Sequence, residues 1–238
     1  GANIEFEKGY VRAKHSGLRG ARMNLRGAFG PSVGATCNVL MAAVLARGRS
    51  EIHGAAREPE VQELGRLLTA MGAEIEGLGS DTIVVEGVRE LRPVDWRVCA
   101  DRIEAGTFAA AALATGGDVV LEGIEIGPMA STLDVFAGWG ATMEMLGADR
   151  LRIRPGEKGA NNLQLTTEPW PGLATDMQPS IVTLLGLTPG LSTMRETIYP
   201  DRWMHLMELN RMGARMRRDG AMAYITGVEA YDGAAVMA

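Results

Sequence analysis

The chain has 238 residues, of which 46% are hydrophobic and 22% are charged, and its formal net charge is −5. This composition is typical of a globular protein with one large or two smaller domains, and no apolar run reaches the ~18 residues of a membrane-spanning helix. The acidic balance, without a lysine- or arginine-rich block, argues against nucleic acid or an anionic membrane as a partner. Two separate cysteines and three distant histidines predict no disulfide framework and no metal site. We therefore expect a cytoplasmic protein without a metal or cofactor.

Gly-Ala pairs that follow apolar, helix-like runs recur along the chain. Three of them, at Gly72, Gly140 and Gly213, stand about 70 residues apart, and two short strand-like segments follow each. A fixed period of this size indicates a repeated supersecondary unit. Gly1-Ala2 is a fourth pair, followed by strand-like segments 3–6 and 10–13. We therefore expect the chain to begin at the tail of one repeat, to end just past the tail of another, and to be cut from a longer protein.

Each repeat is predicted to run strand, helix, strand, helix, strand, strand. The first full repeat is expected to contain, in chain order, strand 21–25, helix 31–46, strand 50–53, a helix that begins at Pro59 and ends just before Gly72, and strands 73–76 and 82–88. Pro31 suits the first turn of its helix. The second repeat is expected to contain helix 107–114, strand 118–122, helix 129–138, and strands 141–145 and 150–153. The third has an apolar helical run at 181–185, a turn at 189–190, a second helix ending at 212, and strands 214–217 and 223–228.

The two kinds of element have different polarity. The first helix of each repeat is almost entirely apolar or small, which is typical of a helix buried on every side. The strands alternate apolar and polar residues, which is typical of a sheet with one solvated face. The combination predicts an α+β fold with helices inside and sheets outside. Segment 98–104 joins the first full repeat to the second and predicts a domain boundary, while the polar, glycine-rich segment 155–162 is a predicted loop.

Six short motifs stand in order along nearly the whole chain, at 32–36, 55–60, 101–108, 175–178, 196–198 and 202–205. Together they resemble the enolpyruvyl transferases, in particular the branch that acts on UDP-N-acetylglucosamine. The resemblance implies two domains, each of three βαβαββ units arranged as an inside-out α/β prism. It also implies that residues 1–100 are the end of the first domain and residues 101–238 are two units of the second, with the hinge near Asp101.

The reaction that the resemblance implies transfers the enolpyruvyl group of phosphoenolpyruvate to the 3-hydroxyl of UDP-N-acetylglucosamine and releases phosphate. This is the first committed step of peptidoglycan synthesis. The chemistry needs a base near the attacking hydroxyl, cations for the phosphates and a proton donor to the methylene carbon. The implied partners are these two substrates and the remainder of the two-domain enzyme.

Asp176 matches the aspartate that, in the family, contacts the sugar 3-hydroxyl and is proposed to take its proton. From the residues alone, Thr175 and Gln178 before an apolar run also form a capping-box pattern, worth about 1 kcal/mol to a helix. Both roles can hold at once.

Ile198 matches a position whose main chain contacts the nucleotide sugar, although its sequence context alone indicates a plain strand residue. Arg202 matches an arginine that helps to hold the phosphate-bearing substrate or intermediate. Without the resemblance, Asp201-Arg202 is an ordinary helix cap followed by an exposed charge.

Ser32 and Val33 match the loop that binds the nucleotide's diphosphate. Free backbone N–H groups and the helix dipole favour phosphate at such a place, and Ser32 is also a candidate N-cap. The family commonly has a lysine just before this pair, whereas this chain has Gly30-Pro31. Gly30 and Pro31 are therefore expected to face substrate without supplying the usual point charge.

Asp101, Arg102 and Glu104 are interpreted as polar residues of the hinge and substrate cleft, with surface charge or capping as an equal alternative for each. The same alternatives stand for Arg57, Glu58 and Glu60, which open a predicted helix.

The family's proton donor lies on a glycine-rich loop, usually Pro-Gly-Gly-Cys, and the sequence contains no such loop. Cys37 lies in a predicted helix and Cys99 at a predicted strand end, so both are interpreted as core residues. We therefore expect the chain alone to have no transferase activity. Two alternatives stay open: another enolpyruvyl transferase, such as the shikimate-pathway enzyme, or a non-catalytic scaffold that binds a nucleotide sugar.

Overall fold

The computed structural model describes residues 2–156 and 162–237. The chain divides into two compact units, Gly1–Cys99 and Ala100–Ala238, and each is described by itself. In the described part of the chain, none of the helices combines the length and the apolar character needed to cross a membrane. Most of the predicted loop 155–162 lies outside the described residues. The assignment of 1–100 and 101–238 to two domains of a longer enzyme stays a prediction.

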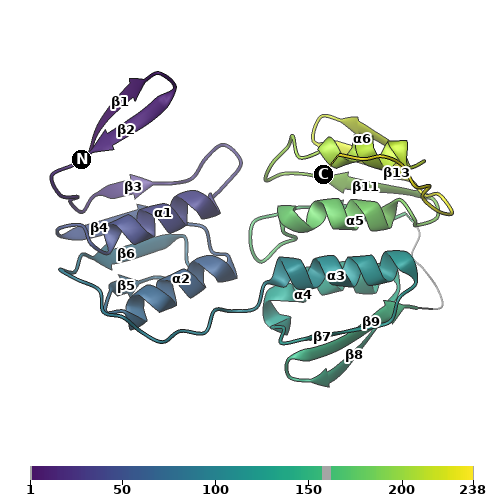
Figure 1. Cartoon of the computed structure of the whole chain (residues 1–238), viewed down its shortest axis with the longest axis horizontal. Coiled ribbons are helices and arrows are strands. Elements are labelled where there is room, and N and C mark those ends of the chain that lie inside the picture. Colours follow the sequence, from purple (N-terminus) through teal and green to yellow (C-terminus); the bar gives the residue numbers. More distant parts are fainter. Residues whose placement is uncertain (1, 157–161, 238) are drawn as a thin grey trace. The chain divides into compact units, whose positions relative to one another are not determined.

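The first unit contains a β-hairpin and one α/β layer (Figure 1). Its elements are β1 (Asn3–Glu7), β2 (Tyr10–Lys14), β3 (Arg22–Asn24), α1 (Val33–Ala43), β4 (Arg49–His53), α2 (Pro59–Ala70), β5 (Glu74–Glu76) and β6 (Thr82–Glu86). β1 and β2 form a two-stranded sheet, and the other strands of the unit form a sheet in the order β3-β4-β6-β5. β3 runs parallel to β4, across the crossover made by α1, and the remaining pairs are antiparallel. The predicted order of elements in the first full repeat is therefore confirmed.

The core of the first unit lies between its two helices and its sheet. Leu40 and Val44 pack there against inward-facing strand residues such as Ile52 and Ile83, all of them buried. The predicted start of the first helix at Pro31 is wrong. Ser32 keeps an extended backbone and its Oγ accepts the N–H of Ala35 at 3.2 Å, so the helix begins at Val33 and Pro31 lies before the cap.

α1 is not buried on every side, contrary to the prediction from its composition. Met41 is 45% exposed on this helix. Within its unit α1 packs against α2 and β6, which cover one face and leave the opposite face open. The second helix follows the prediction, since Pro59 is its first residue and Gly72, with φ 105°, lies just past its end.

The second unit contains two further repeats. Its elements are α3 (Arg102–Thr115), β7 (Val119–Glu122), α4 (Ile126–Trp139), β8 (Ala141–Gly147), β9 (Arg150–Pro155), β10 (Gln164–Thr166), α5 (Gln178–Leu185), β11 (Leu191–Arg195), α6 (Met204–Arg211), β12 (Arg215–Asp219) and β13 (Met222–Thr226). One sheet has the order β7-β9-β8 and the other β10-β11-β13-β12. The third repeat has the predicted order. The second lacks an opening strand, because the described residues 87–101 form none.

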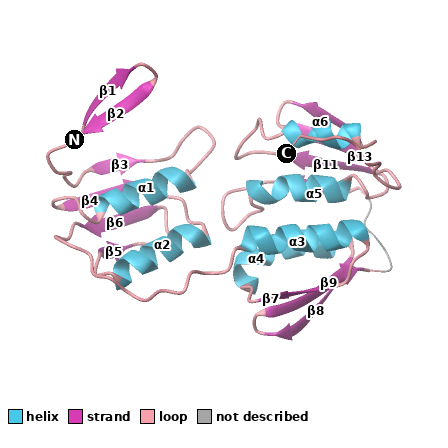
Figure 2. Ribbon diagram, viewed as in Figure 1, coloured by secondary structure: helices cyan, strands magenta, loops and turns pink. Residues whose placement is uncertain are grey.

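In the second unit the helices lie inside and the sheets outside (Figure 2). α3 and α5 pack against each other, α3 also packs on β7 and β9, and α5 also packs on β11 and β13. Small side chains on α3, such as Ala109 and Ala110, face the larger apolar side chains of this core, among them Ile181 and Phe136. Outward positions of the strands stay polar or exposed. These contacts confirm the predicted α+β fold with internal helices.

Two equivalent glycines demonstrate the repeat at the level of the backbone. The N–H groups of Gly87 and Gly227, each just after the last strand of a repeat, donate to the carbonyls of Gly48 and Gly190 at 3.1 and 3.0 Å. A Cβ on Gly87 would lie 1.5 Å from a backbone oxygen, and one on Gly227 would lie 1.8 Å from the backbone oxygen of Thr188. Only glycine permits this close approach, by which the first full repeat and the third each close on the turn after their first helix.

Candidate functional site

Asp176 lies on a short 3-10 helix, Thr175–Met177, that leads into α5. The capping-box prediction is wrong, because neither Thr175 nor Gln178 forms a side-chain cap at the start of the helix. The Thr175 hydroxyl instead donates to Oε2 of Glu196 at 2.9 Å, and Nε2 of Gln178 donates to the carbonyl of Arg202 at 3.3 Å. Both bonds tie the turn that carries Asp176 to the segment after β11.

Arg202 and Asp176 form an ion pair between Nη1 and Oδ1. The same nitrogen donates to Oγ1 of Thr175 at 3.3 Å. The two charged side chains are 34% and 52% exposed, so both can meet a ligand from solvent. The structure thus brings together a carboxylate and a guanidinium that lie 26 residues apart in the chain.

Arg202 does not open a helix, contrary to the interpretation from its sequence context. α6 begins at Met204, and Trp203 occupies the N-cap position. Asp201 does not act as the cap, and its carboxylate forms an ion pair with Arg218 of β12. This alternative partner explains why the local cap pattern failed.

Ile198 lies in the loop after β11, so the strand interpretation is wrong. Its main chain is fixed by Glu196, a fully buried carboxylate whose Oε1 accepts the N–H groups of Ile198 and Tyr199 at 2.8 and 3.0 Å. The same oxygen accepts the hydroxyl of Thr167 at 2.7 Å. Glu196 belongs to the motif 196–198, but its sequence context alone predicts no role for it. A lone carboxylate at the end of an alternating strand was the available signal.

Trp203 and His205 stack beside this site, with ring centroids 6.1 Å apart and ring planes 29° apart. Burial, and after it the positive charge of Arg202, lowers the pKa of His205 to about 4, so its imidazole is neutral at neutral pH. Within the described residues, Oε1 of Gln178, Nε1 of Trp203 and Nε2 of His205 are buried and have no hydrogen-bond partner. The start of α6 therefore carries neutral, largely desolvated polar groups.

Arg102 is the first residue of α3, and its guanidinium lies over the ring of Trp170, 5.4 Å from the centroid. The preceding Asp101 is the N-cap, since its Oδ1 accepts the N–H groups of Ile103 and Glu104 at 2.8 and 3.1 Å. The capping alternative is thus confirmed for Asp101, and it explains why the helix begins earlier than the predicted residue 107. α3 also packs against the 3-10 turn that carries Asp176.

The predicted diphosphate loop lies in the first unit. Ser32 is exposed at the N-cap of α1, and Val33 begins the helix. Gly30 has φ 107°, a conformation that favours glycine, and it pairs with Gly27 through two backbone hydrogen bonds of 2.9 and 3.3 Å. Pro31 follows this turn. The structure brings Ser32, Val33, Gly30 and Pro31 together, and a site shared with Asp176 stays a prediction.

Cys37 and Cys99 are half-buried rather than core residues, so that interpretation is wrong. Cys37 lies on the partly open helix α1, and Cys99 lies in a segment without a strand. Burial, together with the carboxylates of Glu60 and Glu58, raises the pKa of the Cys37 thiol. A thiol with a raised pKa is a poor nucleophile at neutral pH.

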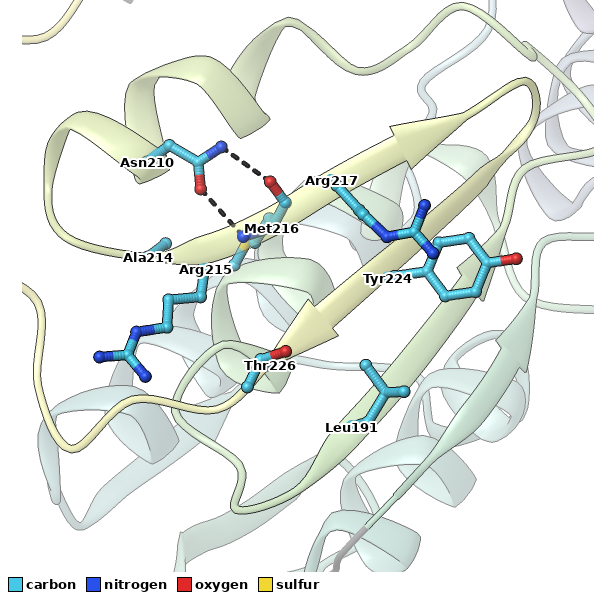
Figure 3. A pocket seen from close by; sticks show the side chains of 8 residues that line it. All are labelled: Leu191, Asn210, Ala214, Arg215, Met216, Arg217, Tyr224 and Thr226. Atoms are coloured by element: carbon cyan, nitrogen blue, oxygen red, sulfur yellow. Dashed lines mark hydrogen bonds between the residues drawn. The ribbon is translucent and has the colours of Figure 1, made fainter.

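An open pocket of about 450 Å³ lies on the sheet β11-β13-β12 (Figure 3). Three of its polar side chains, Arg217, Tyr224 and Asn210, have partners within the fold. The guanidinium of Arg217 lies over the ring of Tyr224, 4.2 Å from the centroid, and the amide of Asn210 exchanges two hydrogen bonds of 2.9 and 3.0 Å with the backbone of Met216. None of the predicted site residues lines this pocket. These contacts fasten β12 to α6 and to its neighbouring strand.

The chain is similar in sequence to several curated relatives named UDP-N-acetylglucosamine 1-carboxyvinyltransferase. It is 46% identical over 239 residues to the one from Methylocella silvestris and 47% identical over 239 residues to the one from Methylorubrum populi. It is 45% identical over 240 residues to the one from Novosphingobium aromaticivorans. Each comparison covers 100% of this chain and 55% of the relative, so the chain spans about half the length of these relatives.

The fold is similar to that of solved enolpyruvyl transferases. The enolpyruvyl transferase NikO from Streptomyces tendae superposes with a TM-score of 0.83 at 23% identity, over 95% of this chain and 55% of that one. EPSP synthase from Acinetobacter baumannii gives a TM-score of 0.64 at 22% identity, over 96% and 55%. Residues 1–238 match the family described as EPSP synthase (3-phosphoshikimate 1-carboxyvinyltransferase). From this match over its whole length, the chain belongs to the EPSP synthase family.

Proposed function

We propose that this chain is part of an enzyme that transfers the enolpyruvyl group of phosphoenolpyruvate to the 3-hydroxyl of UDP-N-acetylglucosamine and releases phosphate. The observation that carries the proposal is the joint placement of Asp176, Arg202 and the main chain of Ile198 around Glu196. The relatives at 45–47% identity, each named UDP-N-acetylglucosamine 1-carboxyvinyltransferase, support this substrate. We place this reaction in peptidoglycan synthesis, in the cytoplasm.

Asp176 is the general base of the proposed reaction. Its carboxylate takes the proton of the 3-hydroxyl as the sugar oxygen adds to C2 of phosphoenolpyruvate and a proton adds to the methylene carbon C3. The added proton is then lost from C3 as phosphate leaves, which restores the double bond in the product. The donor of the C3 proton has no counterpart among the motifs of this chain, so the remainder of the enzyme supplies it.

Arg202 binds the phosphate-bearing substrate in this proposal. A guanidinium has five N–H donors and remains charged, so it can hold Asp176 and still donate to a phosphate oxygen. Ile198 offers its main chain to the nucleotide sugar. Arg102 in the second unit, and Gly30, Pro31, Ser32 and Val33 in the first, complete the proposed substrate contacts. In this arrangement residues 1–100 belong to the first domain of the enzyme and residues 101–238 to the second.

Calorimetry on the full-length protein that contains this chain tests the substrate. UDP-N-acetylglucosamine is expected to bind, and shikimate 3-phosphate is not. Binding of shikimate 3-phosphate alone would instead support the shikimate-pathway enzyme, and binding of the nucleotide sugar without turnover would support a non-catalytic scaffold.

Substitution of the base tests the mechanism. Asp176→Asn keeps the size of the side chain but cannot take the proton, so kcat should fall by about 10²- to 10⁴-fold, the usual contribution of a general base. Binding of UDP-N-acetylglucosamine should stay within a few-fold of wild type. The 238-residue chain by itself should release no phosphate from the two substrates, and measurable turnover by it would contradict that expectation.

A further inference from the structure

Glu196 joins three segments that are distant in the sequence. It is fully buried, and its carboxylate accepts hydrogen bonds from Thr167 just after β10, from Thr175 on the 3-10 turn, and from the loop that holds Ile198. Thr197 reinforces the junction, because its N–H donates to Oγ1 of Thr167 at 3.0 Å. The turn with Asp176 and the loop with Ile198 therefore share one buried anchor.

The two carboxylate oxygens of Glu196 accept hydrogen bonds from different partners. Oε1 accepts the N–H groups of Ile198 and Tyr199, which can only donate, and the hydroxyl of Thr167. Oε2 accepts, within the described part of the chain, the hydroxyl of Thr175 alone. An ionised carboxylate can only accept, so the single hydroxyl proton of Thr175 is committed to Glu196.

This commitment sets the direction of the next bond. With its proton on Glu196, Thr175 presents oxygen lone pairs, and Nη1 of Arg202 donates to that oxygen at 3.3 Å while it also pairs with Asp176. Arg202 thus donates both to Asp176 and to Thr175, and Thr175 donates to Glu196, so a hydrogen-bond relay connects the ion pair to Glu196. Because this relay is anchored at the fully buried Glu196, it restrains the orientation of the partly exposed ion pair between Arg202 and Asp176.

We propose that Glu196 is a positioning residue of this site. It orients Arg202 against Asp176 through the hydroxyl of Thr175, and it holds the main chain of Ile198 directly. The role in catalysis rests on the proposed function, whereas the hydrogen-bond relay is a property of the chain itself. Glu196 touches no substrate in this proposal and acts only through the residues that it holds.

Two nearly isosteric substitutions separate the contacts of Glu196 with the loop that holds Ile198 from its contact with Thr175. In Glu196→Gln the amide oxygen stays toward the N–H groups of Ile198 and Tyr199, because they can only donate, so the new NH₂ group faces Thr175. The Thr175 oxygen then meets two donors and its own proton must turn away. Thr175→Val removes the relay hydroxyl and leaves the contacts of Glu196 with the loop in place. Thr175→Ser keeps the hydroxyl and is the rescue variant.

Amide hydrogen exchange on the 238-residue chain tests the anchor without any substrate. Glu196→Gln replaces a charged acceptor by a neutral one, so exchange at Ile198 and Tyr199 should become about 5- to 10-fold faster. Thr175→Val should leave both rates unchanged. Ser192→Ala is the matched control, because Ser192 is also buried on β11 but its Oγ accepts the N–H of Leu163, just before β10, whereas Glu196 contacts Thr167, just after β10. Unchanged exchange in Glu196→Gln would overturn the proposal, whatever the substrate is.

Steady-state kinetics on the full-length protein test the relay. Thr175→Val and Glu196→Gln should each lower kcat by about 10-fold or more, since misplacement of a catalytic group is costly, while Thr175→Ser and Ser192→Ala stay within about 3-fold of wild type. The KM for UDP-N-acetylglucosamine should rise in Glu196→Gln and stay unchanged in Thr175→Val. Equal kcat in wild type and Thr175→Val would overturn the relay. Failure of the wild-type protein to use UDP-N-acetylglucosamine would overturn the proposed function instead and leave the exchange result standing.

Discussion

The neutral, half-buried imidazole of His205 predicts a specific loss of stability in acid. The folded state binds a proton on this ring only near pH 4, whereas an unfolded histidine binds one near pH 6.5. Between these values the unfolded state carries more protons, so the free energy of unfolding rises with pH. The contribution of His205 to the free energy of unfolding is fully present above about pH 6.5. It is lost progressively as the pH falls toward 4, and it changes no further below that value.

The size of the effect follows from the shift in pKa. Each pKa unit corresponds to about 1.4 kcal/mol, so the full shift sets an upper limit of about 3 kcal/mol. The ring is partly open to solvent, and screening there reduces the expected contribution of His205 to about 1–2 kcal/mol. His205→Gln removes the titration and keeps a polar side chain. Arg202→Met removes the second cause of the shift and should raise the pKa of His205.

Urea unfolding between pH 4.5 and 7.5, followed by circular dichroism, measures this contribution. The free energy of unfolding should fall by about 1–2 kcal/mol more in the wild-type chain than in His205→Gln over that range. An NMR titration of the imidazole checks the pKa directly. Parallel pH dependence in the two proteins, or a ring that titrates near pH 6.5, would refute the reasoning.

Substitutions at four further positions test the fold by urea unfolding at neutral pH. Phe136→Ala removes a fully buried aromatic ring from the core of the second unit and should lower the free energy of unfolding by about 3–5 kcal/mol. Asp101→Ala should lower it by about 1 kcal/mol, because the N-cap of α3 is lost, with Asp101→Asn closer to wild type. Gly227→Ala should cost about 3 kcal/mol or more, since its Cβ would meet a backbone oxygen. Gly138→Ala, in open space on α4, should instead gain about 0.5–1 kcal/mol, and equal effects of the two glycine changes would contradict the close approach at Gly227.

The sequence by itself determined the repeat and the character of its elements. The spacing of Gly72, Gly140 and Gly213, the apolar first helices and the alternating strands depend on residues close together in the chain, so they could be read without coordinates. The six motifs led to the family in the same way. Asp176, Arg202 and Ile198 became candidates through that resemblance, since none of them carries a distinctive local signal.

Only the tertiary structure decided which polar groups meet. Thr175 had the local pattern of a helix cap, yet its hydroxyl donates to Glu196, 21 residues away in the chain. Asp201 had the pattern of a cap and pairs with Arg218 of a later strand. A local pattern offers a hydrogen-bonding group its nearest partners, but the folded chain offers competitors from distant strands. The hydrogen bond to a buried carboxylate such as Glu196 forms in preference to the helix cap. A buried carboxylate without donors would destabilise the fold more than an uncapped helix end.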